Sequence, residues 1–310
     1  MTDAPPPSTT GCRAVIADET AQVRQIWSTL GLPGVIDVHT HFMPKSVLDK
    51  VWNYFDSAGP LVGRPWPIAY RDNESQRVNT LRRFGVRRFT ALVYPHKPRM
   101  AAWLNQWSAQ FARHTPDCLA TATFYPELGA TEYVEKAIRG GTRVFKAHIQ
   151  VGRYDPNDPL LDGVWGIIED TGIPVVIHCG SGPAPGEHTG PEPIDRLLRR
   201  YPRLRLIIAH MGMPEYAEFF DICERHQEVM LDTTMAFTPF AEETMPFPPS
   251  QWHRLGQLGD RVVFGSDFPN IPYAYSEAMR SLTRLPGVDD GWLRGVFYEN
   301  AARLFDGIPR

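Results

Sequence analysis

Eight short runs of mainly apolar and β-branched residues recur along the chain, and most of them are separated by segments with a helical pattern. The runs are 35–42, 88–94, 118–124, 142–148, 174–179, 204–210, 229–234 and 261–266. Their apolar character is nearly continuous rather than alternating, which is typical of parallel strands buried on both faces. Helical patterns such as 101–114 and 192–200 lie between the runs. Eight strands alternating with helices predict an α/β fold, the (β/α)₈ or TIM barrel.

A doubly wound open sheet is the alternative architecture for such a chain. That fold would carry a GxGxxG turn after its first strand, and none follows the first run. Residues 1–33 are predicted to form an N-terminal extension, with a Pro-rich disordered tail at 2–11 and a short helix at 18–30. Residues 34–310 are expected to form a single barrel domain that carries the catalytic site.

The composition excludes several other classes of protein. The 310-residue chain has 32 basic and 35 acidic residues, which gives a formal net charge of −3 and no support for a nucleic-acid or anionic-membrane surface. No apolar run approaches the roughly 18 residues of a membrane span, and the first residues lack the pattern of a secretory signal. Four cysteines without CxxC spacing indicate reduced thiols. We therefore expect a cytoplasmic protein with a small-molecule substrate and no nucleic-acid or membrane partner, and a homodimer stays open.

Residue types that bind metals gather at the ends of the runs. His39 and His41 lie at i and i+2 in the first run, so their side chains point to the same side of a strand. An HxH pair alone fits two hydrogen-bonded histidines equally well. Further run ends carry His148, His178 and His210, and Asp267 follows the eighth run. Because a barrel of this type forms its active site at the carboxyl ends of its strands, we expect one shared site, and this donor set suits Zn²⁺ or a related divalent ion.

Three segments together resemble the amidohydrolase superfamily, in the branch that includes aminocarboxymuconate semialdehyde decarboxylase and related hydrolases. They are DVHTHFMP at 37–44, GSDFP at 265–269 and ENAARLF at 299–305. The resemblance extends over 34–310, with the motifs in the family's order. It implies a metal-dependent enzyme on a (β/α)₈ barrel, but it does not specify a substrate.

The resemblance also implies a role for each matching residue. His39, His41 and His178 would bind one divalent ion, most simply zinc, with manganese or iron as alternatives. Asp267 would be a further ligand or the catalytic base, and His210 a catalytic group beside the substrate. Such an ion lowers the pKa of its bound water to about 7. Asp267 can then accept a proton, and His210 can polarise a carbonyl or hold an oxyanion.

Lys146 is ambiguous, because in some branches of the superfamily this lysine is carboxylated and bridges two metals. We favour one metal, with Lys146 supporting a ligand or contacting the substrate. His148 and Arg153 are further candidates for contact with the substrate. Trp66 lies in a long aromatic segment, 43–75, which with 235–250 is predicted to form loops at the catalytic face. These aromatic residues fit either a flat, apolar substrate or simple packing on the barrel rim or at an oligomer interface.

The leading hypothesis is hydrolysis of a C–N or C–O bond in a small organic acid, amide or lactone, through water activated by the metal. The alternative is non-oxidative decarboxylation of an aromatic or unsaturated carboxylic acid by nearly the same residues. Lys146 slightly favours hydrolysis over decarboxylation, because the resemblance implies that the decarboxylase of this branch does not rely on a lysine at that position. A non-catalytic binding barrel would have lost part of the metal set, whereas here every position holds a competent ligand type.

Overall fold

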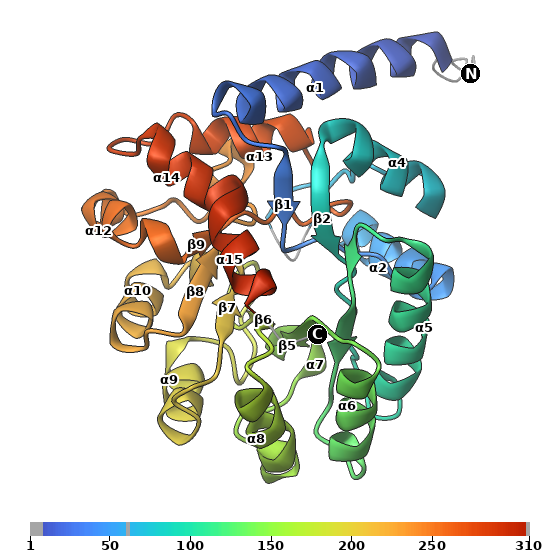
Figure 1. Ribbon diagram of the computed structural model, residues 1–310, viewed down its shortest axis with the longest axis vertical. Helices are drawn as coiled ribbons and strands as arrows, with labels where there is room; N and C mark the ends of the chain where they lie inside the picture. The colour runs from blue at the N-terminus through green and yellow to red at the C-terminus, as the bar shows by residue number, and fades with distance from the viewer. Residues whose placement is uncertain (1–8, 60–62, 308–310) are drawn as a thin grey trace.

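The computed structural model describes residues 9–59 and 63–307, and its core is a set of parallel strands in chain order (Figure 1). One sheet contains β1 (Val35–Asp37), β2 (Val86–Thr90) and β3 (Cys118–Leu119). The second sheet contains β4 (Thr121–Thr123), β5 (Val144–His148), β6 (Val175–His178), β7 (Leu206–Ile208), β8 (Val229–Asp232) and β9 (Val262–Val263). Each of the eight predicted runs contains strand, and the third run is divided into β3 and β4.

Backbone hydrogen bonds connect the two sheets on both sides. β3 and β4 are consecutive and are separated only by Ala120, whose carbonyl accepts from the backbone N–H of Arg143 at 2.7 Å, just before β5. On the other side, the Val38 N–H donates to the Phe264 carbonyl at 2.9 Å, which links the chain after β1 to the chain after β9. This arrangement is the predicted (β/α)₈ barrel.

Helices surround the strands as an outer ring (Figure 1). They are α1 (Thr9–Thr29), α2 (Lys45–Ser57), α4 (Glu74–Phe84), α5 (Ala101–His114), α6 (Ala130–Arg139), α7 (Ile149–Gly152), α8 (Asp162–Thr171), α9 (Pro191–Arg200), α10 (Tyr216–Arg225), α11 (Pro239–Glu242), α12 (Trp252–Gln257), α13 (Tyr275–Leu282), α14 (Asp290–Arg294) and α15 (Asn300–Asp306). Within the described residues, no helix combines the length and the apolar character needed to span a membrane.

Four of these helices were not predicted, namely α2, α4 and the short helices α7 and α11, of which α11 lies in the predicted loop 235–250. α2 occupies part of 43–75, which the sequence predicted as a long loop, so that prediction was wrong for its first half. Its apolar residues recur at helical spacing, with Leu48 buried against the barrel and Trp52 packed beside it. α4 begins with a capping box in which the Asn73 side chain accepts from the Gln76 N–H. Both patterns are readable in the sequence.

The N-terminal helix is longer than predicted. α1 begins at Thr9, within the segment 2–11 predicted as a disordered tail, and residues 2–8 of that segment lie outside the described residues. The buried Glu19 carboxylate accepts from the Tyr70 hydroxyl at 2.6 Å and from the Ser276 N–H at 3.2 Å. These bonds fasten α1 to the outside of the barrel.

The strands are buried because helices cover one face and barrel side chains fill the other. Val175, Val176 and Ile177 of β6 are fully buried, and burial of each such side chain stabilises the fold by roughly 1.5–3 kcal/mol. The carboxyl ends of the strands are the exception. There the apolar residues give way to the polar side chains that form the candidate site.

Candidate metal centre

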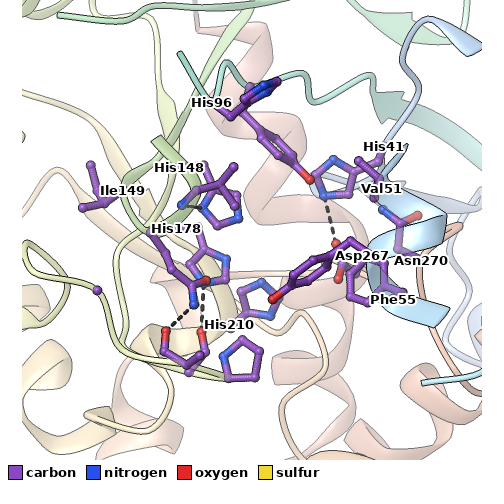
Figure 2. A pocket seen from close by; sticks show the side chains of 18 of the residues that line it. His41, Val51, Phe55, His96, His148, Ile149, His178, His210, Asp267 and Asn270 are labelled. Carbon is purple, nitrogen blue, oxygen red and sulfur yellow. Dashed lines mark hydrogen bonds and ion pairs between the residues drawn. The ribbon is translucent and has the colours of Figure 1, made fainter. Parts of the chain in front are cut away.

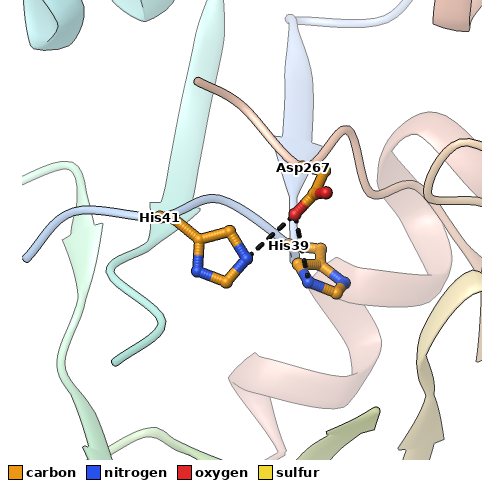
Figure 3. Close-up of side chains that lie close together, drawn as sticks. All are labelled: His39, His41 and Asp267. Atoms are coloured by element: carbon orange, nitrogen blue, oxygen red, sulfur yellow. Dashed lines mark ion pairs between the residues drawn. The ribbon is translucent and has the colours of Figure 1, made fainter. Parts of the chain in front are cut away.

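Three buried side chains can offer ligand atoms to one metal ion. His39 and His41 follow β1, Asp267 follows β9, and one ligand atom from each lies within 4.8 Å of the others (Figure 3). Asp267 Oδ1 is 2.9 Å from His41 Nε2 and 3.6 Å from His39 Nε2. Two ligands bound at about 2.1 Å in tetrahedral geometry are separated by roughly 3.4 Å. The spacing of these atoms therefore fits a single ion.

The Nδ1 atoms of His39 and His41 face away from Asp267, and both are hydrogen-bonded. His39 Nδ1 contacts Asp232 Oδ2 at 2.9 Å, and His41 Nδ1 contacts the Leu92 carbonyl oxygen at 2.8 Å. A carbonyl or carboxylate oxygen only accepts, so each Nδ1 carries a proton, and Nε2 is the nitrogen left to offer a lone pair to a metal ion. Neutral histidines oriented by an outer hydrogen bond are the usual metal ligands in proteins.

Asp232, at the end of β8, is a candidate site residue that sequence reasoning missed. It is fully buried, and its Oδ1 also accepts from the backbone N–H of His210 at 2.8 Å and of Thr234 at 3.0 Å. Burial raises the pKa of Asp232, while these hydrogen bonds and the nearby charges oppose that rise. Its position at a strand end, like that of the histidines, was the available signal.

Asp267 combines a charged side chain with a strained backbone. Burial alone would raise the pKa of its carboxyl, but contact with His41 and the charges of His39 and His210 outweigh burial and lower that pKa. Its φ of 70° lies in the left-handed region, which non-glycine residues occupy only at a cost. Its N–H donates to the His39 carbonyl at 2.8 Å, which holds the carboxylate beside the two imidazoles.

The neighbouring Gly265 makes this close approach possible. A Cβ at Gly265 would overlap Thr234 Oγ1 and lie 2.7 Å from the Cβ of His39. Only a residue without a side chain fits between the chain after β9 and the ligand histidine.

His210 lies next to the triad but outside it. Its ring centroid is 5.1 Å from that of His39, and its Nδ1 lies 3.1 Å from the Thr234 carbonyl oxygen, so Nδ1 is the protonated nitrogen. Burial and the charge of His39 lower the pKa of His210 to about 4. His210 is therefore neutral at pH 7, with Nε2 as a proton acceptor.

Lys146 is fully buried beside His39, with Nζ 3.5 Å from His39 Nε2. Burial lowers its pKa to about 8, although the charges of Asp232 and Asp267 act in the opposite direction. Lys146 does not line the cavity described below.

His178 and His148 stack with ring centroids 4.1 Å apart and an interplanar angle of 11°. Burial lowers the pKa of both well below the ordinary value. His178 Nε2 contacts the Gly182 carbonyl oxygen at 3.0 Å, and the ring centroid of His178 is 4.7 Å from that of His210. The structure thus brings His178 to the edge of the triad without including it.

Asp37 has a structural role instead of contacting a histidine ring. Its carboxylate accepts from the Ser266 hydroxyl at 2.6 Å and from the Tyr275 hydroxyl at 2.9 Å. It also accepts from the backbone N–H groups of His39 and Ser266. These bonds connect the chain after β1 to the chain after β9.

The triad opens into a cavity of about 1120 Å³. Figure 2 shows His148, His178 and His210 along one wall and His41 with Asp267 along the other. Trp66 and Arg153 also line the cavity, as do apolar residues of α2 and of the segment after β8. Trp66 is fixed by a 2.7 Å hydrogen bond from its Nε1 to the Asn270 carbonyl and packs against Phe240.

Tyr94 is a second residue that sequence reasoning did not single out. Its ring centroid lies 5.6 Å from that of His41 and 4.7 Å from that of His148, and it lines the cavity. Burial and the charge of Asp267 raise its pKa, so the hydroxyl remains a hydrogen-bond donor.

Solved structures with the same fold come from several bacteria. An uncharacterized TIM-barrel protein from Bordetella bronchiseptica is 20% identical, with 89% of this chain and 100% of that chain covered at a TM-score of 0.73. The 5-carboxyvanillate decarboxylase of Sphingomonas paucimobilis is 16% identical, with coverage of 88% and 99% and a TM-score of 0.60. The 5-carboxyvanillate decarboxylase of Novosphingobium aromaticivorans, solved with manganese and 4-hydroxy-3-methoxy-5-nitrobenzoic acid, is 14% identical, with coverage of 89% and 97% and a TM-score of 0.58.

At these identities the similarities establish the fold alone. No curated protein matches the chain by sequence. The sequence pattern of the family described as amidohydrolase, in contrast, matches residues 36–307. That match contains the candidate metal triad and nearly the whole barrel, so this chain is an enzyme of the amidohydrolase family.

Proposed function

We propose that the protein is a metal-dependent hydrolase that cleaves a C–N or C–O bond in a small organic acid, amide or lactone. The observation that carries the proposal is the position of Asp267. Its carboxylate is ionised, contacts both inward-facing histidine nitrogens and lines the cavity. A base in that position can take the proton of an attacking water and pass it to the leaving group.

His39, His41 and Asp267 would hold the metal, with His178 as a further ligand. A bound divalent ion supplies Lewis-acid activation of water and of the scissile carbonyl. Zinc suits this mixed histidine and carboxylate set, and manganese is an alternative, since a similar structure contains it.

The other polar residues of the cavity have complementary roles in this proposal. His210 is neutral with a free Nε2, so it accepts a proton rather than donating a hydrogen bond to an oxyanion. This is a change from the sequence-based expectation that His210 holds the oxyanion. Tyr94 keeps its proton and can donate to a developing negative charge.

A second candidate is non-oxidative decarboxylation of an aromatic or unsaturated carboxylic acid. Aromatic and apolar side chains favour it, because Phe55, Trp66 and Phe240 line the same cavity. Two of the similar structures are 5-carboxyvanillate decarboxylases. Asp267 or His210 would then manage the proton that replaces the carboxylate.

Isotope labelling of the product distinguishes the two reactions. Metal-loaded enzyme is assayed with lactones, aryl esters and anilides of small organic acids in ¹⁸O-labelled water. The same enzyme is assayed with aromatic carboxylic acids in deuterated water, with CO₂ release followed. Hydrolysis places one ¹⁸O in the acid product, and decarboxylation places one deuterium on carbon.

Two variants define the site. His210→Ala is expected to lose most activity. His114→Ala, which changes an exposed histidine of α5 bonded to its own helix, is expected to retain it. Release of CO₂ without ¹⁸O incorporation into any acid would overturn the hydrolase proposal in favour of the decarboxylase. No turnover of either class by metal-loaded protein would contradict both.

A further inference from the structure

Asn270 lies in the cavity wall three residues after Asp267, and hydrogen bonds hold it in one orientation. Its backbone N–H donates to the Asp267 carbonyl oxygen at 2.8 Å, and Figure 2 shows the two residues side by side. The Asn270 carbonyl oxygen accepts from Trp66 Nε1 at 2.7 Å, and its side-chain Oδ1 accepts from Trp52 Nε1 at 3.0 Å. Both the backbone and the side chain of Asn270 are therefore fixed.

The bond from Trp52 determines which end of the Asn270 amide is left free. An indole N–H only donates, so the amide atom that it contacts must be the oxygen. The Nδ2 group, with two N–H donors, is then the other end. Within the described part of the chain Nδ2 has no hydrogen-bond partner, and it is the only polar group of Asn270 without one. A donor without a partner on the lining of a cavity is placed to bind an acceptor atom of a ligand.

Two arginines hold the Trp52 ring from which this orientation comes. The guanidinium carbons of Arg71 and Arg77 each lie 5.6 Å from the Trp52 ring centroid, a distance at which a cation and an aromatic face attract. Arg77 is buried, and its Nε and Nη1 have no hydrogen-bond partner among the described residues. The rings of Trp52 and Phe42 supply favourable contacts for this buried charge. The direction of the indole N–H is thus set by contacts that need no substrate.

We propose that Asn270 is a substrate-binding residue whose Nδ2 donates a hydrogen bond to an acceptor oxygen of the substrate, beside the metal triad. Trp52 is a positioning residue that keeps the amide in this orientation. The inference rests on the proposed function, which places the reacting bond at the triad. A fixed donor there contributes most where the substrate oxygen gains negative charge during the reaction.

An amide donor complements the other polar groups of the cavity. The carboxylate of Asp267 and the Nε2 of His210 only accept, and Asn270 adds a donor to that of Tyr94. The amide is neutral, so it binds a carbonyl oxygen as well as a charged one. The group that Asn270 selects is an oxygen without a proton. A substrate analogue with a methylene or an N–H at that position leaves Nδ2 unpaired and is bound less tightly.

The test measures the binding of two small metal ligands by isothermal titration calorimetry on metal-loaded protein, so it does not depend on turnover. Acetohydroxamate chelates a divalent ion through two oxygens that also accept hydrogen bonds. Imidazole binds through nitrogen and has no acceptor left. Asn270→Leu removes the amide at similar size. We expect it to weaken acetohydroxamate binding about tenfold or more, as for loss of one hydrogen bond to a charged oxygen, and to leave imidazole affinity unchanged.

A second variant keeps the contact with Trp52. Asn270→Asp still offers an oxygen to the indole N–H, but it replaces the Nδ2 donor by an acceptor. We expect this variant to weaken acetohydroxamate binding at least as much as Asn270→Leu does, because two acceptors then face each other.

The role of Trp52 is tested by a double-mutant cycle. Trp52→Phe removes the indole N–H and should weaken acetohydroxamate binding about threefold or more in the wild type, but not in the Asn270→Leu background. A purely structural effect of Trp52 would be the same in both backgrounds. Trp107→Phe is the matched control, because Trp107 is also half-buried, packs against the same buried apolar cluster and does not line the cavity. It should leave both affinities unchanged.

The outcomes separate this inference from the proposed function. Unchanged acetohydroxamate affinity in Asn270→Leu would overturn the inference and leave the hydrolase proposal standing. An equal loss for imidazole would show a damaged metal site instead of a lost donor and would also overturn it. Additive effects of Trp52→Phe and Asn270→Leu would contradict the positioning role of Trp52. Binding that depends on Asn270, in a protein that turns over no ester, amide or lactone, would contradict the proposed function and support the inference.

Discussion

Asp267 Oδ1 lies 2.9 Å from His41 Nε2, and the hydrogen bond from His41 Nδ1 to the Leu92 carbonyl makes Nε2 the nitrogen that can offer a lone pair to a metal ion. Two acceptors at hydrogen-bond distance require a cation between them, either a proton or a metal ion. His39 repeats the arrangement, with Asp232 in the place of the Leu92 carbonyl. The account of this protein as a metal enzyme depends on a metal ion taking this position between the carboxylate and the two Nε2 atoms.

Replacement of Asp232 tests the outer hydrogen bond of His39. Asp232→Asn keeps the size of the side chain but weakens its acceptance of the His39 Nδ1 proton. We expect metal affinity to fall about 10- to 100-fold, as for other residues that orient metal ligands. Competition with a chromophoric chelator gives the affinity. Asp306→Asn, at an exposed surface carboxylate paired with Arg88, serves as the control and should leave it unchanged.

His178 and His210 should respond differently to truncation. We expect His178→Ala to lose the metal and turnover, because its neutral imidazole lies at the edge of the triad. His210→Ala should keep the metal and lose most activity. Metal analysis after gel filtration decides between them. Full occupancy in His178→Ala would contradict its role as a ligand, and metal loss in His210→Ala would make His210 a ligand.

Gly265→Ala should disturb the site through packing alone. The added methyl would lie 2.7 Å from the Cβ of His39, and overpacking of this kind costs about 1–3 kcal/mol. We expect a lower melting temperature and weaker metal binding. Gly166→Ala, in the middle of α8 with no atom within 4 Å of the new methyl, is the control and should be neutral or slightly stabilising. Wild-type metal affinity in Gly265→Ala would contradict the predicted clash.

Lys146 predicts a pH dependence of stability in the metal-free protein. Burial lowers its pKa from the ordinary 10.5 to about 8 in the folded chain. Between these two pH values the unfolded chain holds the proton and the folded chain does not, so the free energy of unfolding rises with pH. The stabilisation gained when Lys146 is uncharged is fully present above pH 10.5 and is lost as the pH falls through about 8.

The check compares urea unfolding of chelator-treated wild type and Lys146→Met across that range. The free energy of unfolding of the wild type, relative to that of Lys146→Met, should increase as the pH rises. Lys136→Met, at an exposed lysine of α6, is the matched control. An identical pH profile for wild type and Lys146→Met would contradict the role of Lys146 burial.

The sequence predicted the barrel because its strands are continuous apolar runs, and it predicted His39, His41 and Asp267 because each follows a strand. The contact between His39 and Asp232 could not be predicted in the same way. The two residues are 193 positions apart, and only the curvature of the barrel brings the end of β8 beside the end of β1. The helix α2 was missed for another reason, since its aromatic residues were interpreted as loop residues although their spacing is helical.

The orientation of individual side chains also could not be predicted from the sequence. His178 and His39 both end predicted strands, yet His178 Nε2 is bonded to the Gly182 carbonyl and His39 Nε2 faces Asp267. Asp37 precedes His39 by two residues, but its carboxylate accepts hydrogen bonds from the hydroxyls of Ser266 and Tyr275 instead of contacting the His39 ring. Hydrogen-bond partners from distant segments decide such differences.

The metal content of protein purified without chelators tests the central claim most directly. The account predicts about one divalent ion per chain by elemental analysis, lost in His41→Ala and recovered by the wild type when metal is added back. About two ions per chain would indicate a binuclear site with a modified Lys146. No bound metal, even after zinc, manganese and iron are each added, would contradict the account.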